Sequence, residues 1–167
     1  MSRNYIYNTV MELIDKNGTR QPYELADALG IKIIETSIRP LQGAFYIIFN
    51  QPTIFIEESL REDQKLIVCG HEDGHAVLHP ELVRTGNLAE FEVFDMREPV
   101  EYEANIFAAH LLIDEDELLN YLRMGYSVFQ TAMLMKVNPN LVNIKLSEMN
   151  CWGYNFDTSW GSHELFR

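Results

Sequence analysis

Gly70-His71-Glu72-Asp73-Gly74-His75 is the most informative stretch of the chain, because it places a His-Glu-x-x-His motif in a run of helical spacing. On a helix, residues four positions apart lie about 6 Å apart along the axis and roughly 40° apart around it. His71 and His75 can therefore reach one metal ion from a single face, and imidazole nitrogen is a common zinc ligand. Glu72 follows His71 beside that face, where its carboxylate can accept a proton from water.

The sequence predicts that this helix covers residues 60–78. Ser59 and Glu62 form the pattern of a capping box, with Ser59 as the N-cap and Glu62 at the third helical position. His79-Pro80 ends the helix, because proline disfavours helical structure in the residue before it. The motif is therefore expected in the second half of a long helix.

Small and apolar residues share the helix face of the two histidines, which indicates a buried, preformed site. Gly70 and Gly74 should each cost about 1 kcal/mol of helix propensity relative to alanine. We therefore expect another backbone to come close at both glycines. The alternative is that both histidines are ordinary helical residues. The predicted face consists of Ile67, Gly70, His71, Gly74, His75 and Leu78.

Length and composition predict one globular domain over residues 1–150 and a C-terminal tail over residues 151–167. The chain has 167 residues, 47% of them hydrophobic, so it can bury a core. It contains no apolar run long enough to span a bilayer, and residues 1–7 lack the apolar segment of a signal peptide. Cys69 and Cys151 are too few for a disulfide framework. A cytoplasmic location is the expected result.

The formal net charge of −12 bears on the choice of partner. Such a charge repels nucleic-acid phosphates and anionic membrane surfaces, whereas it permits a basic protein partner. The acidic bias can also serve solubility alone. We therefore expect no direct contact with nucleic acid or membrane.

A small β-sheet is predicted ahead of the motif helix, from strands at residues 31–36, 44–49 and 53–56. Asn50-Gln51-Pro52 resembles a hairpin break between the last two. A free sheet edge could pair with an extended peptide, or the sheet could only pack on the helix. Helices are expected before the sheet at residues 5–16 and 22–29. Residues 91–94 are expected to form a short strand or a flap.

A second helix is predicted over residues 100–113, with a narrow stripe of mostly small residues. If this stripe packs on the glycines of the motif helix, Glu101 at its head becomes the third metal ligand. Asn105, one turn later, could hydrogen-bond a ligand histidine and set its tautomer. Glu103 points to another side of the helix and is the weaker ligand candidate. The stripe consists of Glu101, Ala104, Asn105, Ala108 and Leu112.

Three short helices should follow at residues 114–124, 127–135 and 138–149, capped by Asp114, Ser127 and Asn138. Short helices joined by a tight turn could form a DNA-binding helix-turn-helix. However, Lys145 is the only basic residue of the last helix, and the charge balance is acidic. The sequence therefore favours a different function for this region.

Two motifs, 26 residues apart from His75 to Glu101, resemble those of the ImmA/IrrE family of metallo-endopeptidases. The resemblance extends over nearly the full chain. It implies a mainly helical α+β fold of the zincin-like, gluzincin type, with Glu101 as the ligand glutamate. The motifs are Cys69-Gly70-His71-Glu72-x-Gly74-His75-Ala76-x-Leu78-His79-Pro80 and Glu101-x-Glu103-Ala104-Asn105-x-Phe107-Ala108-Ala109-x-Leu111-Leu112.

The same resemblance implies a cytoplasmic zinc endopeptidase that cleaves a helix-turn-helix repressor encoded nearby on a phage or mobile element. His71, His75 and Glu101 would bind Zn²⁺, and Glu72 would be the general base. A rival hypothesis is a non-proteolytic zinc-binding regulator that binds a transcription factor. Candidates for stabilising the oxyanion are Tyr46, Tyr102 and His163.

Other polar residues near the motif have different expected roles. Asp73 stands where relatives carry a large apolar residue, so its carboxylate must find a partner or water, or stay protonated. His79 is expected to cap the end of the motif helix, because it lies too far along the axis from His71 to share an ion. His110 is expected on the surface.

Overall fold

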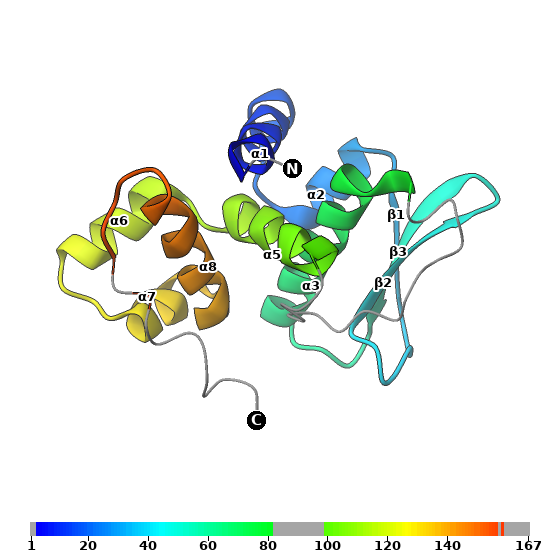
Figure 1. Ribbon diagram of the computed structural model, residues 1–167. Coiled ribbons are helices and arrows are strands. Elements are labelled where there is room, and N and C mark those ends of the chain that lie inside the picture. Colours follow the sequence, from blue (N-terminus) through cyan, green and yellow to red (C-terminus); the bar gives the residue numbers. More distant parts are fainter. Residues whose placement is uncertain (1–2, 82–98, 157, 159–167) are drawn as a thin grey trace. The chain divides into compact units, whose positions relative to one another are not determined.

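The computed structural model describes residues 3–81, 99–156 and 158, and the chain divides into two compact units, residues 1–112 and 113–167 (Figure 1). The described residues form seven helices and one three-stranded sheet, which confirms the predicted α+β class. No described helix has both the length and the apolar character needed to cross a membrane. The extent of a single domain over residues 1–150 stays a prediction. The expected strand or flap at residues 91–94 lies outside the described residues.

The sheet of the first unit has the order β1-β3-β2, with β1 (Lys32–Thr36) parallel and β2 (Gly43–Ile48) antiparallel to β3 (Gln51–Glu57). The hairpin turn consists of Phe49 and Asn50, both at positive φ (50° and 64°). The expected hairpin is present, but its turn is shorter than the break predicted at residues 50–52, because β3 already begins at Gln51. A two-residue turn makes Ile48 and Gln51 a hydrogen-bonded pair. The next pair, Ile47 and Pro52, is then a non-hydrogen-bonded pair, so the missing N–H of proline interrupts no hydrogen bond of the sheet.

One face of the sheet packs on the motif helix, α3 (Glu62–Leu78). The buried side chains of this layer come from α2 (Pro22–Ala28), from the strands and from α3. Because α3 is anchored on the sheet by its apolar side, its histidine face is left for α5. The layer consists of Ala26, Ile31, Phe45, Ile54, Ile56, Val68 and Cys69.

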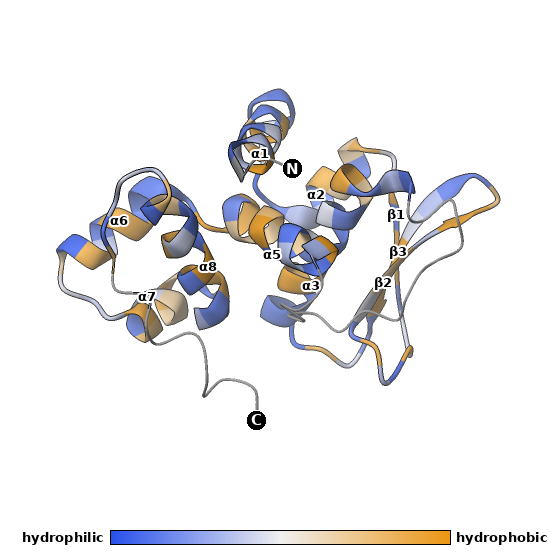
Figure 2. Cartoon of the chain, viewed as in Figure 1, coloured by the Kyte–Doolittle hydropathy of each residue, from blue (hydrophilic) through white to orange (hydrophobic). Residues whose placement is uncertain are grey.

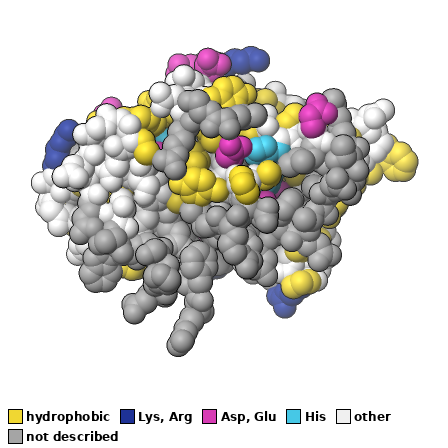
Figure 3. Space-filling view, viewed as in Figure 1, with side chains coloured by type: hydrophobic (Ala, Val, Ile, Leu, Met, Phe, Trp, Pro, Cys, Tyr) yellow, Lys and Arg dark blue, Asp and Glu magenta, His cyan; other side chains and the backbone are white. Residues whose placement is uncertain are grey.

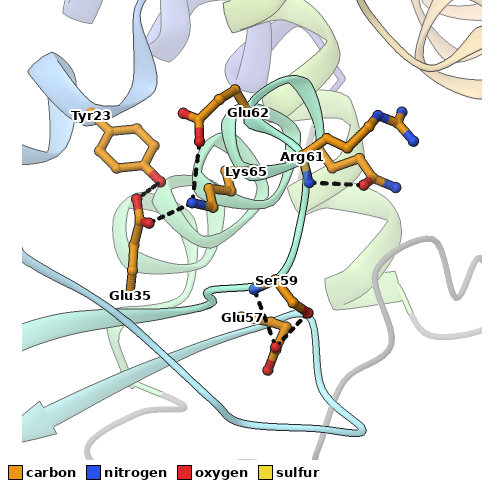
Figure 4. A network of polar contacts seen from close by, with 8 residues as sticks. Tyr23, Glu35, Glu57, Ser59, Arg61, Glu62 and Lys65 are labelled. Carbon is orange, nitrogen blue, oxygen red and sulfur yellow. Dashed lines mark hydrogen bonds and ion pairs between the residues drawn. The ribbon is translucent and has the colours of Figure 1, made fainter.

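The start of α3 differs from the predicted capping box. Arg61 is the N-cap, and its backbone N–H donates to the side chain of Gln64 (3.2 Å) (Figure 4). The hydroxyl of Ser59 instead donates to the buried carboxylate of Glu57 (2.7 Å), which also accepts from the N–H of Ile38 (2.8 Å). Hydrogen bonding, first from the Ser59 hydroxyl, lowers the pKa of Glu57 to about 2. Ser59 therefore serves the end of β3, and the helix begins later than predicted.

A polar network ties the first turn of α3 to β1 and α2 (Figure 4). Lys65 is buried, and its ammonium group lies 2.6 Å from Glu35 Oε2 on β1 and 3.3 Å from Glu62 Oε1. Tyr23 on α2 donates its hydroxyl to the other oxygen of Glu35 (2.9 Å). The hydrogen bond from Lys65 leads the effects that lower the pKa of Glu35. The network holds three elements in register at the N-terminal end of the motif helix.

Helix α5 (Pro99–Leu112) packs against α3 and is buried along most of its length, in keeping with its apolar character (Figure 2). Helix α1 (Arg3–Asn17) also packs on α5. Arg20 donates to the backbone oxygens of His110 (2.9 Å) and Leu111 (3.3 Å) at the end of α5. The ring of His110 is buried and meets Tyr7 edge-on at 5.3 Å between ring centres. The expectation that His110 is a surface residue was therefore wrong.

The predicted close approach of a second backbone is confirmed at Gly74 but not at Gly70. A methyl group at position 74 would lie 3.1 Å from the Cα and the carbonyl oxygen of Ala104, and equally close to the Cβ of Phe107. At position 70 it would meet side-chain atoms of Leu112 and Pro22 at 3.5 Å, an ordinary van der Waals distance. Of the two glycines, Gly74 is therefore the one at which the backbone of α5 comes close to α3.

We expect Gly74→Ala to destabilise the protein by about 1–3 kcal/mol, because the backbone of α5 cannot yield to the added methyl group as a side chain could. Gly70→Ala is the matched control on the same helix. It should leave stability unchanged or raise it by up to about 1 kcal/mol, through helix propensity. Denaturant midpoints of both variants decide the point. Equal stability of the two would contradict the inferred contact.

The second unit contains α6 (Glu115–Arg123), α7 (Val128–Met135) and α8 (Pro139–Asn150). Their predicted N-caps are confirmed, since Asp114, Ser127 and Asn138 each accept a backbone N–H of the following turn. Lys145 on α8 is 2% exposed, and its ammonium group lies 3.5 Å from Glu115. The one basic side chain of the last helix is thus turned inward.

The described part of the C-terminal tail folds back on the end of α8. The Asn150 side chain donates to the backbone oxygen of Phe156 (2.9 Å) and accepts from its N–H (2.7 Å). Tyr154 stacks on the Phe156 ring at 5.4 Å between centres. This pairing holds residues 151–156 against the helix end.

Candidate metal centre

Three side chains from two helices meet in the interior of the first unit. His71 and His75 come from α3 and Glu101 from the first turn of α5, and their exposed fractions are 1%, 6% and 0%. The two Nε2 atoms lie 3.0 Å apart. Glu101 Oε2 lies 3.1 Å from His71 Nε2, and Glu101 Oε1 lies 3.1 Å from His75 Nε2. Among the described residues, this is the group of His, Cys, Asp or Glu side chains that could hold a metal ion.

The tautomer of His71 is set from the far side of its ring. Asn105, one turn after Glu101, has its Oδ1 3.0 Å from His71 Nδ1. An amide oxygen only accepts, so Nδ1 carries the hydrogen. In the neutral ring the lone pair is then on Nε2, which faces His75 and Glu101. The predicted contact of Asn105 with a motif histidine is therefore present.

The donor set fits a divalent cation. Glu101 Oε1 accepts no hydrogen bond from the described residues, although it is fully buried and close to His75 Nε2. The two Nε2 atoms and the carboxylate thus converge on one small space, where a lone pair on each of them would cost free energy unless a cation or a proton lay between them. Two imidazoles and a carboxylate form a typical catalytic zinc ligand set.

The charges of the three groups agree with this interpretation. Burial alone would raise the pKa of Glu101, but His71 and His75 outweigh it and hold the pKa at about 2. Burial lowers the pKa of His75, which favours the neutral imidazole. Burial also opposes a charge on His71, yet the Glu101 carboxylate raises the pKa of this ring overall. A proton on His71 therefore competes with a metal ion for the same position.

Glu72 is buried beside the cluster but is not part of it. Burial raises its pKa to about 7, with the charge of His71 opposing and that of Glu101 adding to the shift. A carboxyl group with a pKa near neutrality can both accept and return a proton at neutral pH. Its side chain packs on Gly43, the first residue of β2.

Other residues singled out in the sequence lie around the cluster. Glu103 faces away from it, with Oε2 3.4 Å from His79 Nε2. His79 is the C-cap residue of α3, as predicted, and its N–H donates to the oxygen of His75 (3.0 Å). In the face shown in Figure 3, histidine and acidic side chains reach the surface together between hydrophobic ones.

The three candidates for an oxyanion donor have different outcomes. Gly43, Phe45 and Ile47 are on the face of the sheet that packs towards α3. Because side chains alternate along a strand, Tyr46 points to the opposite face, where its ring meets Phe55. Tyr46 is therefore excluded from the cluster side. Tyr102 is on α5 and stays a candidate, whereas His163 lies outside the described residues.

Asp73 is fully buried, and neither of its carboxylate oxygens has a hydrogen-bond partner among the described residues. Burial, followed by the charge of Glu72, raises its pKa well above the usual range. Arg84 and Arg97, the basic residues considered as partners, lie outside the described residues. Burial therefore disfavours the ionised form of Asp73.

We expect Asp73→Leu to raise the free energy of unfolding by about 1–2 kcal/mol at neutral pH. A carboxyl group whose pKa is higher in the folded than in the unfolded state makes the protein less stable as pH rises above the unfolded pKa of about 4. The gain over wild type should therefore be larger at pH 8 than at pH 5. Denaturant titrations at both pH values measure it. A loss of stability at both would instead indicate a partner for Asp73.

Comparison with known proteins agrees with this geometry. The model of the peptidase M78 family, described as the IrrE N-terminal-like domain, matches residues 26–147, well over half of the chain. The protein belongs to the peptidase M78 family. The resemblance to ImmA/IrrE proteins is confirmed, and the matched range contains the three clustered side chains, Glu72 and Asn105.

A second similarity is to a protein described as "Uncharacterized immunity region protein 2" of Bacillus phage phi105. The two sequences are 32% identical over 142 residues, which cover 84% of this chain and 89% of the phage protein. This M78 chain is thus similar to the phage protein over most of both lengths.

Sequence reasoning did not find Gly43. The only signal was a glycine just ahead of the strand expected at residues 44–49, and nothing in the sequence pairs it with Glu72 on α3.

Proposed function

We propose that this protein is a zinc-dependent endopeptidase, in which His71, His75 and Glu101 hold Zn²⁺. The observation that carries the proposal is the buried convergence of two Nε2 atoms and a carboxylate at 3.0–3.1 Å, with the other nitrogen of His71 bonded to Asn105. Membership of a peptidase family supports hydrolysis of a peptide bond. A gluzincin-type fold, with the ligand glutamate on a second helix, belongs to the same proposal.

Zinc in such a site supplies Lewis acidity, which polarises the scissile carbonyl and makes water more acidic. The chain's own residues supply the rest. Glu72, with a pKa of about 7, takes a proton from the attacking water and returns it to the leaving amine. Asn105 holds the His71 ring so that Nε2 keeps its lone pair towards the cluster.

The proposed substrate is a helix-turn-helix repressor of a phage or mobile element. Support comes from the relative named after a phage immunity region, and from charge. A protein that binds DNA presents basic side chains, and the net charge of −12 on this chain attracts such a surface. Cleavage of the repressor would then relieve the element from repression.

One observation favours a second candidate, a zinc-binding regulator that acts by binding a transcription factor. The clustered side chains are almost fully buried, and closed sites are typical of structural zinc. Against this, a structural site needs no carboxyl group with a pKa near neutrality beside it. We therefore rank the peptidase first.

The test uses the purified full chain and the repressor encoded beside its gene. Metal content is measured by mass spectrometry, and the repressor is analysed by intact mass after incubation with zinc-loaded or chelator-treated protein. The peptidase predicts one defined cut that requires the metal. An intact repressor in a stable complex with the zinc-loaded protein would favour the regulator instead.

A further inference from the structure

We infer that Gly43 is a positioning residue for Glu72, an inference that rests on the proposed peptidase function. Gly43 opens β2 and is buried against α3. A methyl group at this position would lie 2.4 Å from Val68 Cγ1, 2.7 Å from Glu72 Oε1 and 3.2 Å from Glu72 Cγ. The carboxyl group of Glu72 therefore occupies space that any other residue at position 43 would fill.

Backbone conformation does not explain this glycine. Among the glycines that the structure describes, those that adopt a positive φ are at positions 18, 30, 125 and 153, and Gly43 is not one of them. Within a strand, glycine gives up cross-strand packing and conformational entropy, and it often marks a place where another group comes close. At Gly43 that group is the side chain of Glu72. The site therefore depends on the absence of a side chain at position 43 and not on an unusual backbone conformation.

If alanine replaced Gly43, the side chain of Glu72 would move more readily than that of Val68. Val68 is a buried, β-branched residue of the core between sheet and helix, so its methyl group has little freedom. Glu72 Oε1 is the end of a flexible side chain, and its carboxyl group would be displaced from a Cβ at position 43. A displacement of about 1 Å at a reacting group can lower a rate ~10²-fold. His71, His75 and Glu101 would keep their places.

The test compares Gly43→Ala, Val68→Ala and the double variant as full-length, zinc-loaded proteins. Val68→Ala removes the 2.4 Å contact but leaves those to Glu72. The double variant should recover only part of the folding stability that Gly43→Ala loses, with kcat still ~10–100-fold below that of Val68→Ala. Zinc content and KM should stay near wild type. Recovery of kcat together with stability would overturn the inference, because Gly43 would then serve only core packing.

A second measurement needs no activity. Glu72→Ala removes the atoms at 2.7 and 3.2 Å, so Gly43→Ala should lower the denaturant midpoint less in that background than in the wild type. Equal losses in both backgrounds would overturn the contact between the two residues. If the wild type cuts no repressor, the peptidase proposal fails by itself, and this midpoint comparison still decides whether Gly43 sets the position of Glu72.

Discussion

Glu72→Gln should bind about one zinc ion per chain and fold normally, yet cleave the repressor more slowly by a factor on the order of 10² or more. Glutamine keeps the shape of the side chain beside Gly43 but cannot accept a proton. The buried carboxyl group, with its pKa raised to about 7, is the group that the reaction loses. Zinc should stay bound because Glu72 is outside the cluster of possible ligands.

The comparison is made by incubating wild type and variant with the neighbouring repressor, followed by intact-mass analysis and zinc determination. Asp73→Asn is the matched control, because it makes the same change of carboxyl to amide one residue further along α3. It should cut at about the wild-type rate. Equal cleavage by Glu72→Gln and wild type would falsify Glu72 as the base. If neither cuts and both bind the repressor tightly, the regulator is the better hypothesis.

Glu101→Ala should lose most of the bound zinc, whereas Glu103→Ala on the same helix should keep it. The Glu101 carboxylate is fully buried within 3.1 Å of both ring nitrogens, and its pKa of about 2 keeps it ionised at neutral pH. Without it, two imidazoles remain where catalytic zinc ordinarily has three protein ligands. Glu103 is not part of this cluster, and its Oε2 lies 3.4 Å from His79 Nε2.

Metal analysis after dialysis distinguishes the two variants directly. Unfolding curves of the metal-free proteins should accompany it, because truncation of a buried side chain can also loosen the contact between α3 and α5. Glu101→Gln, which keeps the size of the side chain but removes its charge, is the isosteric control. Retention of zinc by Glu101→Ala, with loss from Glu103→Ala, would move the third ligand to the other side of α5.

Much of the fold was predictable because its signals are local. The N-caps Asp114, Ser127 and Asn138 bond to the turn that follows each of them, so short sequence patterns suffice. The same holds for the spacing of His71 and His75, since helix geometry alone places them on one face. The small-residue stripe of α5 added the one long-range prediction of this kind, that Glu101 comes to the two histidines.

Where local signals competed with distant groups, the predictions were wrong. Ser59 has the sequence of an N-cap, but the buried carboxylate of Glu57, which also binds Ile38, takes its hydroxyl. His110 is polar and was expected in solvent, but it packs on Tyr7 from the first helix. Each outcome depends on a neighbour that the local pattern does not contain.

The sequence by itself determined the α+β class, the order of its elements and the residue types of the candidate centre, because hydrogen-bond spacing and hydrophobic periodicity act over a few residues. Only the tertiary structure decided that Gly74 and not Gly70 meets a backbone, and that Gly43 leaves room for Glu72. It also decided that burial and charge move the pKa values of Glu72 and Glu101 in opposite directions. These properties arise from packing between segments distant in the chain, where a difference of less than 1 Å separates contact from clash.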